Sequence, residues 1–287
     1  QVFIKYGKQP RAEFNNKPLL FFGDDQTTIT DKNEVGVEHD IDSSIISALR
    51  DTAEINSMAE LALKLPGDIP AFGLIDGSLS QWKVTSSNQR IQESLMEDYN
   101  LAVQRLKKIA QAKNLSIASY ISSPATKESI NALRIGICPF PTPDCNKHCV
   151  GQPMLSRPCD VIARVRDRDL FTKLLDPGQR SGLFNSKNSI TSSKNSELIS
   201  YFYIKTKTEI ARIEIPEWSS ANIDKIHSVI FDQIGLGHGY PISLQEAHEQ
   251  AVVRSSDRKS FWRVIESKIS DSRLPSQKNV SKSRRGI

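Results

Sequence analysis

The chain has 287 residues, of which 38% are hydrophobic and 25% charged, an ordinary composition for a globular protein with a sizeable core. It contains no run of eighteen apolar residues, which excludes a membrane-spanning helix, and no visible signal peptide. We therefore expect a cytoplasmic protein that does not associate with a membrane. The net charge of +5 is uneven, because residues 254–287 hold ten Lys or Arg against three acids. Such a tail suits a polyanion such as nucleic acid, or is simply solvated and disordered.

Apolar periodicity predicts alternating strands and helices in the first half of the chain. Residues 2–6 read as a strand and residues 19–22 as a short apolar run. A helix capped by Ser43 or Ser44 carries an amphipathic face until Pro66-Gly67 ends it. Residues 71–75 then form a buried strand that leads into an aspartate.

A second helix is predicted over residues 90–113 and a strand over residues 116–121. This alternation favours an α/β fold with parallel strands. Further along, residues 198–204 and 209–215 indicate a hairpin, whereas residues 185–196 read as a polar loop. No periodic pattern continues beyond about residue 270, and we expect disorder there.

Asp76 is the strongest candidate for chemistry, because a carboxylate at the end of an apolar strand is followed by Gly77 and Ser78. Glu54 lies in the preceding helix, which a short turn joins to this strand, so the two carboxylates can approach each other. Two such groups repel unless a divalent cation lies between them, and oxygen ligands favour magnesium or manganese. The alternatives are that Asp76 caps a turn and Glu54 is a solvated helix charge.

Residues 237–249 join a glycine-rich turn to a short helix. Ser243 and Glu246 have the spacing of a capping box, which predicts a helix starting at Ser243. Tyr240 then precedes the helix, and His248 lies on its second turn. His248 suits a metal ligand or a general acid/base, with a packed histidine and a turn aromatic as the alternatives. Together with the strand-end aspartate, this pattern indicates a metal-dependent hydrolase.

Two further pairs carry alternatives of equal weight. Arg212 and Glu214 are two apart on a strand and share one face, so they could meet a phosphate and a metal, or pair with each other. Arg180 and Ser181 follow a helix that begins near Asp167. They could contact a DNA backbone or form an ordinary structural salt bridge.

All four cysteines fall in a proline-rich loop, residues 138–159. Their spacing lacks the C-x2-C pairs of common zinc ribbons, but the clustering suits zinc or an iron–sulfur cluster. Free thiols and, less well, disulfides are the alternatives, and His148 is an alternative ligand. The cysteines are Cys138, Cys145, Cys149 and Cys159.

In this order, the motifs resemble those of the NurA nuclease family over nearly the whole chain. The cysteine-loop version is similar to bacterial members of the cyanobacterial type. The last of the matching motifs is the most specific. They are Arg50 with Glu54, Leu74-Ile75-Asp76-Gly77-Ser78-Leu79, Ser119 to Pro124, Gly178-Gln179-Arg180-Ser181 with Phe184, Arg212-Ile213-Glu214-Ile215-Pro216, and Gly239-Tyr240-Pro241 with Ala247-His248.

The resemblance implies an RNase H-like core, with a mixed sheet and flanking helices, over residues 1–269, and a disordered basic tail over residues 270–287. It implies a homodimer that cleaves DNA with Mn²⁺ or Mg²⁺, as a 5′–3′ exonuclease and single-strand endonuclease. That activity belongs to double-strand break end resection and repair, with a HerA-type hexameric translocase as partner. The family's metal ligands map onto Glu54 and Asp76, and its active-site motif onto Tyr240 and His248. We expect Asp167 and Glu214 to have supporting roles in the site. We expect Arg180, Ser181 and Arg212 to contact DNA.

The sequence departs from the family pattern at one point. The family carries an aspartate in an earlier Asp-Gly-Ser motif, upstream of a segment like residues 2–7, and this sequence does not contain that earlier motif. We expect an N-terminally truncated chain that lacks one catalytic carboxylate, which weakens metal binding and can abolish activity. The alternative function is therefore a non-catalytic DNA-binding or scaffold protein. An RNA-processing enzyme on a similar core is a third hypothesis, and substrate preference separates it from the first.

Overall fold

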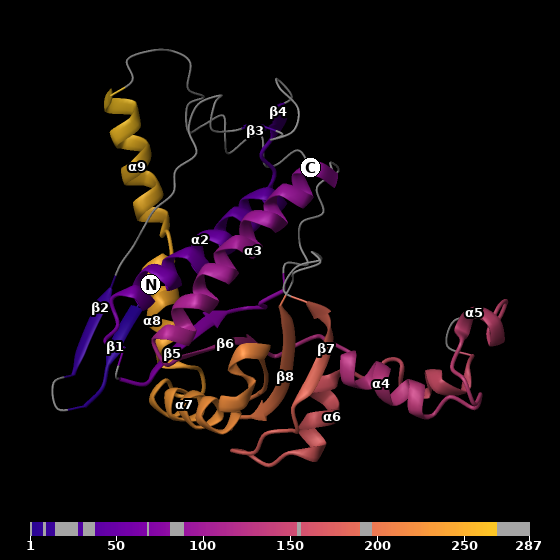
Figure 1. The fold of residues 1–287 in the computed structure, drawn as a ribbon. Helices are drawn as coiled ribbons and strands as arrows, with labels where there is room; N and C mark the ends of the chain where they lie inside the picture. Colours follow the sequence, from indigo (N-terminus) through magenta and orange to yellow (C-terminus); the bar gives the residue numbers. More distant parts are fainter. Residues whose placement is uncertain are drawn as a thin grey trace. The chain divides into compact units, whose positions relative to one another are not determined.

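The computed structural model describes residues 2–7, 10–14, 28–30, 38–67, 69–80, 89–153, 156–189 and 197–268 (Figure 1). The chain divides into two compact units, residues 1–247 and 248–287, and each is described by itself. The predicted apolar run at residues 19–22 and the tail at residues 270–287 lie outside the described residues. No helix in the described part of the chain is long and apolar enough to span a bilayer.

A five-stranded sheet in the order β5-β6-β9-β8-β7 forms the centre of the first unit. Its parallel pair is β5 and β6, and the other neighbours run antiparallel. The sheet is therefore mixed, as predicted. The bounds are Ala71–Asp76 for β5, Leu115–Ser122 for β6, Phe184–Ser189 for β7, Leu198–Lys205 for β8 and Ile210–Pro216 for β9.

Two long helices, α2 (Ser43–Leu63) and α3 (Gln89–Ala112), pack against each other and cover one face of the sheet (Figure 1). Their apolar stripes meet the sheet in a core cluster that includes Ile55, Leu106 and Ile117. The amphipathic spacing predicted for both helices is confirmed within two residues at each end. Burial of these stripes, rather than helix propensity, supplies most of the stabilisation of such helices.

The opposite face is covered by α7 (Ile223–Leu236), whose buried Ile226 and Ile230 pack on the apolar side chains of β6, β8 and β9. Gln233 of the same helix joins two other segments. Its Nε2 donates to the Tyr6 hydroxyl at 2.6 Å, and its Oε1 accepts from the Ser243 amide at 3.2 Å. The start of α8 (Ile242–Ala251) is thereby attached to the α7 face.

The remaining elements of the first unit are short. An antiparallel hairpin of β1 and β2 begins the chain, and β1 confirms the predicted first strand. A second antiparallel pair, β3 with β4, precedes α2. The bounds are Val2–Lys5 for β1, Arg11–Phe14 for β2, Thr28–Thr30 for β3, Glu38–Asp40 for β4, Glu128–Gly136 for α4, Cys145–His148 for α5, Pro158–Ile162 for η1, Asp167–Leu174 for α6 and Glu217–Asn222 for η2.

Three local predictions are corrected. Asp42, not a serine, caps α2, and its Oδ1 accepts from the amides of Ser44 and Ile45 at 2.8 and 2.9 Å. The hydrogen bond from the Ser44 hydroxyl, followed by these amide bonds, lowers the pKa of Asp42. Helix α8 begins at Ile242, so Ser243 lies inside the helix and does not cap it. The Ser243 amide donates to Gln233, whereas in a capping box it would donate to Glu246. Part of the predicted polar loop is the edge strand β7, because backbone pairing with β8 organises it despite its polar residues.

The second unit contains the end of α8 and one further helix, α9 (Ser255–Lys268). Phe261 and Val264 of α9 are exposed on its surface. The predicted α/β fold with a mixed sheet and flanking helices is confirmed, while the RNase H-like character of its core stays a prediction.

Candidate active site

Asp76 is the last residue of β5, an edge strand, and its side chain is exposed there. In the parallel register it stands opposite Tyr120 of β6. Gly77 follows with φ +92°, and its amide donates to the Tyr120 carbonyl at 3.0 Å. Because L-residues rarely adopt this φ, glycine lets the chain turn away directly after the carboxylate. The predicted strand-end aspartate is thus at the surface of the sheet edge.

Tyr240 is brought to this carboxylate from a position 164 residues further along the chain, and its hydroxyl donates to Asp76 Oδ1 at 3.1 Å. Its ring meets the Tyr120 ring edge-on, with centroids 5.2 Å apart. Burial, the Asp76 charge and this hydrogen bond raise the pKa of Tyr240. The hydroxyl therefore remains protonated at neutral pH and acts as a donor to Asp76.

Glu54 lies on α2 with its side chain half exposed, and Arg50 Nε approaches its Oε1 at 3.5 Å. Burial raises the pKa of Glu54; the Arg50 charge opposes this, and the charges of Asp51 and Asp76 add to it. The Asp76 charge is one of the smaller contributions to this shift. The expected approach of Glu54 to Asp76 across the short turn stays a prediction.

Asp51 was not among the residues predicted for the site. It also pairs with Arg50, at 3.3 Å. Burial raises the pKa of Tyr99, with added contributions from Asp51, Glu214 and Glu54. The charges of these three carboxylates therefore act on one tyrosine of α3, whose hydroxyl donates to the Leu79 carbonyl just after β5. Asp51 and Glu54 are three residues apart on a helix and therefore lie on one face. From this spacing, Asp51 could have been predicted as a further candidate residue of the site.

The donor chemistry around Asp76 suits a hard divalent cation. Magnesium and manganese sites commonly use one or two carboxylates and keep several waters, and Asp76 with Glu54 supplies two. Among the residues that the structure describes, no three His, Cys, Asp or Glu side chains are grouped to hold a metal. His248 is exposed and opens the second unit, so its predicted part in this site stays a prediction.

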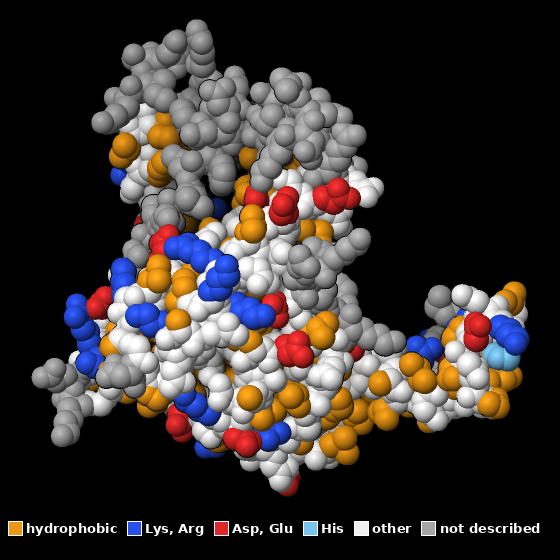
Figure 2. All heavy atoms as spheres, in the orientation of Figure 1, with side chains coloured by type: hydrophobic (Ala, Val, Ile, Leu, Met, Phe, Trp, Pro, Cys, Tyr) orange, Lys and Arg blue, Asp and Glu red, His pale blue; other side chains and the backbone are white. Residues whose placement is uncertain are grey.

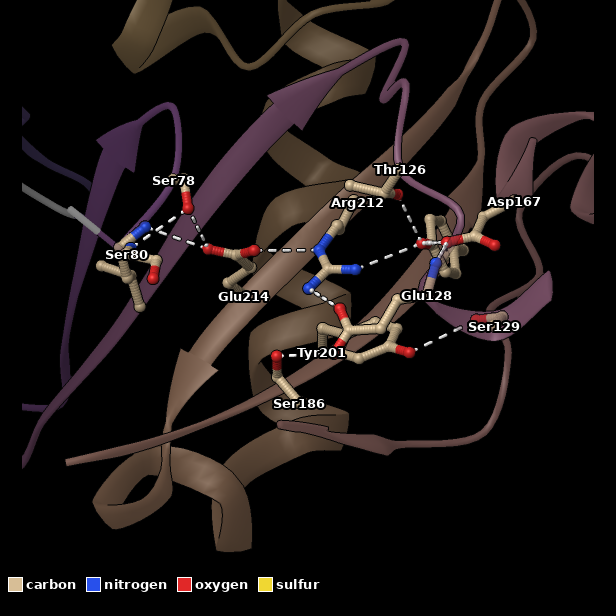
Figure 3. Close-up of polar contacts among 12 residues, drawn as sticks. Ser78, Ser80, Thr126, Glu128, Ser129, Asp167, Ser186, Tyr201, Arg212 and Glu214 are labelled. Carbon is tan, nitrogen blue, oxygen red and sulfur yellow. Dashed lines mark hydrogen bonds and ion pairs between the residues drawn. The ribbon is translucent and has the colours of Figure 1, made fainter. Parts of the chain in front are cut away.

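Arg212 and Glu214 are buried on β9, 2% and 4% exposed, and Arg212 Nε donates to Glu214 Oε1 at 2.9 Å (Figure 3). Of the two alternatives left by their spacing, mutual pairing is the one that the structure shows. This burial corrects the expectation that Arg212 meets a DNA phosphate, because its guanidinium has almost no surface to offer.

Asp167 is fully buried and organises the start of α4 (Figure 3). Its carboxylate accepts from the amides of Glu128 and Ile130 at 2.8 and 2.9 Å. It also accepts from the Tyr203 hydroxyl at 2.7 Å. Three donors satisfy the buried charge and fix the helix N-terminus, so its contacts are those of a structural residue.

Arg180 and Ser181 also make structural contacts. Arg180 pairs with Asp224 at 2.7 Å. Ser181 is buried, accepts from the Tyr203 amide at 2.9 Å and donates to the Gly182 carbonyl at 2.8 Å. The salt-bridge alternative therefore describes this pair, and contact with DNA stays a prediction that only the partly exposed Arg180 side chain suits.

The cysteine segment follows α4, and the space-filling view shows it as a surface rich in hydrophobic side chains (Figure 2). All four cysteines are free thiols; Cys149 and Cys159 are buried, while Cys145 is exposed. Burial raises the pKa of Cys149, with Arg157 opposing and the other three cysteines adding to the rise. The thiols are neighbours, but they are not gathered at metal-binding distance. The ring of His148, the alternative ligand, is stacked on the Phe140 ring, with the ring centroids 4.2 Å apart.

The fold and this geometry define a mixed α/β protein with an exposed carboxylate, Asp76, at the end of an edge strand. A family model, the NurA domain, matches residues 5–253, so the chain belongs to the NurA domain family. Membership implies a nuclease that acts in DNA end resection. The crystal structure of the NurA nuclease from Sulfolobus solfataricus matches 80% of this chain and 69% of that chain, with 14% identity and a TM-score of 0.47. A comparison with curated proteins gives no match.

Proposed function

We propose that this protein is a manganese- or magnesium-dependent deoxyribonuclease whose site is centred on Asp76. The observation that carries the proposal is the contact between two predicted residues, Asp76 and Tyr240, at the end of β5. Tyr240 donates to the Asp76 carboxylate at 3.1 Å, and the Asp76 charge contributes to the raised pKa of Glu54. Family membership supports a phosphodiester substrate.

Asp76 and Glu54 would hold the divalent cation. When bound, such a cation polarises the phosphate and lowers the pKa of an attacking water. Tyr240 orients Asp76 through its hydroxyl, since its raised pKa keeps the proton in place. Arg50, which pairs with Glu54 at 3.5 Å, would release this carboxylate for the cation. His248 completes the proposal as a proton carrier or a third ligand.

The finer activity that we propose is 5′–3′ exonuclease and single-strand endonuclease cleavage during repair of double-strand breaks. The protein would act in the cytoplasm as a homodimer with a HerA-type hexameric translocase. The basic residues 254–287 would supply affinity for the DNA backbone. For the cysteine segment we propose a zinc ion or an iron–sulfur cluster, supported by the clustering of all four cysteines within residues 138–159.

The proposal is tested with 5′-labelled and 3′-labelled single-stranded DNA, incubated with the protein in Mn²⁺ or in EDTA. We expect cleavage in Mn²⁺ alone and its loss in Asp76→Asn. Asp232→Asn is the matched control, because Asp232 is exposed on α7. The positions of the shortened products on the two labels report the polarity. Cleavage that is unchanged by Asp76→Asn would refute the site.

The alternative of a non-catalytic DNA-binding or scaffold protein predicts a different result. It requires salt-dependent DNA binding without cleavage by the wild-type chain in Mn²⁺. An RNA-processing enzyme would instead cleave an RNA strand of the same sequence faster than the DNA strand.

A further inference from the structure

The turn after Asp76 is attached to a distant strand through one carboxylate. Glu214 Oε2 accepts from the Ser78 hydroxyl at 2.9 Å and from the Leu79 amide at 3.0 Å (Figure 3). Glu214 lies on the central strand β9, 135 residues from Leu79 in the sequence. Its two partners are the second and third residues after Asp76. A carboxylate with two donors from one turn fixes that turn more tightly than a single neutral hydrogen bond does.

Arg212 fixes the carboxylate from the other side. Its Nε donates to Glu214 Oε1, and its Nη2 donates to Glu128 Oε2, both at 2.9 Å. The guanidinium lies 3.7 Å from the centre of the Tyr201 ring, which restricts its plane. Both oxygens of Glu214 are therefore engaged within the protein. Glu214 therefore binds neighbouring groups of the protein through both oxygens, whereas the sequence had left open that Glu214 contacts a metal.

The turn has a second anchor on the helical side. The Tyr99 hydroxyl of α3 donates to the Leu79 carbonyl at 3.0 Å, and Leu79 is 3% exposed. Only Gly77 separates this anchored segment from Asp76, and its amide is itself held by the Tyr120 carbonyl at 3.0 Å. The chain that leaves Asp76 is therefore held at three successive residues, so a change at Ser78 and Leu79 reaches the carboxylate through one residue.

We propose that Glu214, held by Arg212, is a positioning residue that fixes the turn after Asp76 and so sets the Asp76 carboxylate relative to Glu54. A buried ion pair is weak evidence for stability in itself, because apolar residues of similar volume are often as stable. A positional function accounts for this pair. The inference rests on the proposed function for its effect on cleavage, but not for its effect on the turn.

The test variant is Glu214→Gln, which keeps the shape but cannot accept from Arg212 and from the turn with the same strength. In the metal-free protein, we expect hydrogen exchange of the Leu79 amide and its neighbours in residues 77–80 to accelerate at least tenfold. The Mn²⁺ concentration that gives half-maximal cleavage should rise about tenfold, in the range found for residues that orient metal ligands. The rate at saturating Mn²⁺ should change much less.

Glu197→Gln is the matched control, because Glu197 is also largely buried and paired with a lysine, Lys107, away from the turn. We expect it to leave both readouts unchanged. Ser78→Ala removes one of the two turn bonds without disturbing the buried pair. Ser78→Ala should therefore shift both readouts in the same direction by a smaller factor. This variant provides the test if Glu214→Gln folds poorly.

Unchanged exchange at residues 77–80 in Glu214→Gln and in Ser78→Ala would overturn the positioning inference. So would faster exchange accompanied by a wild-type Mn²⁺ requirement. A different result separates the two proposals: accelerated exchange in a protein whose wild type does not cleave DNA in Mn²⁺. That outcome would sink the nuclease proposal and leave the anchoring of the turn established.

Discussion

Replacing Glu54 by glutamine gives a prediction in which stability and activity move in opposite directions. Burial raises the pKa of Glu54, the Arg50 charge partly offsets this rise, and the charges of Asp51 and Asp76 add to it. The ionised carboxylate is thus held at a cost, which Glu54→Gln removes. A carboxylate whose pKa is raised by folding contributes stability below its ordinary pKa, and this contribution is lost as the pH rises through the folded value.

The magnitude is small because the side chain is half exposed. Charge interactions at such a half-exposed site are worth roughly 0–1 kcal/mol, because solvent screens them. The attraction of Arg50 is already part of the net rise of the Glu54 pKa. We therefore expect Glu54→Gln to unfold between the wild-type temperature and about 2 °C above it at pH 7, with no difference below pH 4 or so.

The assay is thermal unfolding in EDTA from pH 3.5 to pH 8, followed by the same series with Mn²⁺. Added Mn²⁺ should stabilise the wild type by about 2.7 kcal/mol at a hundred times its dissociation constant, and the variant much less. Glu60→Gln, exposed on the same helix, is the control. A loss of 2 kcal/mol or more in EDTA at pH 7 would refute the electrostatic reasoning, since it would show Glu54 to be a stabilising group.

The other predictions concern the buried pair, the histidine and the thiols. Arg212→Met should lower the free energy of unfolding by about 3–5 kcal/mol, because it leaves Glu214 buried without its partner; a loss below 1 kcal/mol in chemical denaturation would contradict this. His248→Ala should slow cleavage by about 10²–10⁴-fold if His248 handles a proton, with an unchanged unfolding temperature, whereas an unchanged rate would remove it from the site. With a thiol reagent, Cys145 should react well before Cys149, and Zn²⁺ should protect both; equal rates with and without Zn²⁺ would count against the cysteine metal site.

The elements that could be predicted from the sequence are those with a regular apolar pattern. Helices α2 and α3 and strands β5 and β6 each bury one face or both, and burial leaves its period in the residue order. Strand β7 has no such pattern, because backbone pairing with β8 can hold an edge strand whatever the polarity of its residues. The start of α8 was misplaced because Gln233, on another helix, accepts from the amide that a capping box would have used.

The site divides in the same way. Asp76 and Tyr240 were recognisable because glycines flank them and mark turns next to regular elements. The contact between Glu214 and Leu79 joins residues 135 apart, and no local spacing encodes such a distance. The burial of Arg212 was equally hidden, since an arginine on a strand has the same sequence pattern whether it faces DNA or a partner carboxylate.

The central claim is that the Asp76 carboxylate binds the divalent cation that the cleavage requires. Electron paramagnetic resonance of Mn²⁺, titrated against the wild type and against Asp76→Asn, measures this binding directly and without DNA. We predict that the wild type depletes the signal of free Mn²⁺ and that Asp76→Asn binds at least tenfold more weakly, with Asp232→Asn unchanged. Equal binding by the wild type and Asp76→Asn would contradict the account.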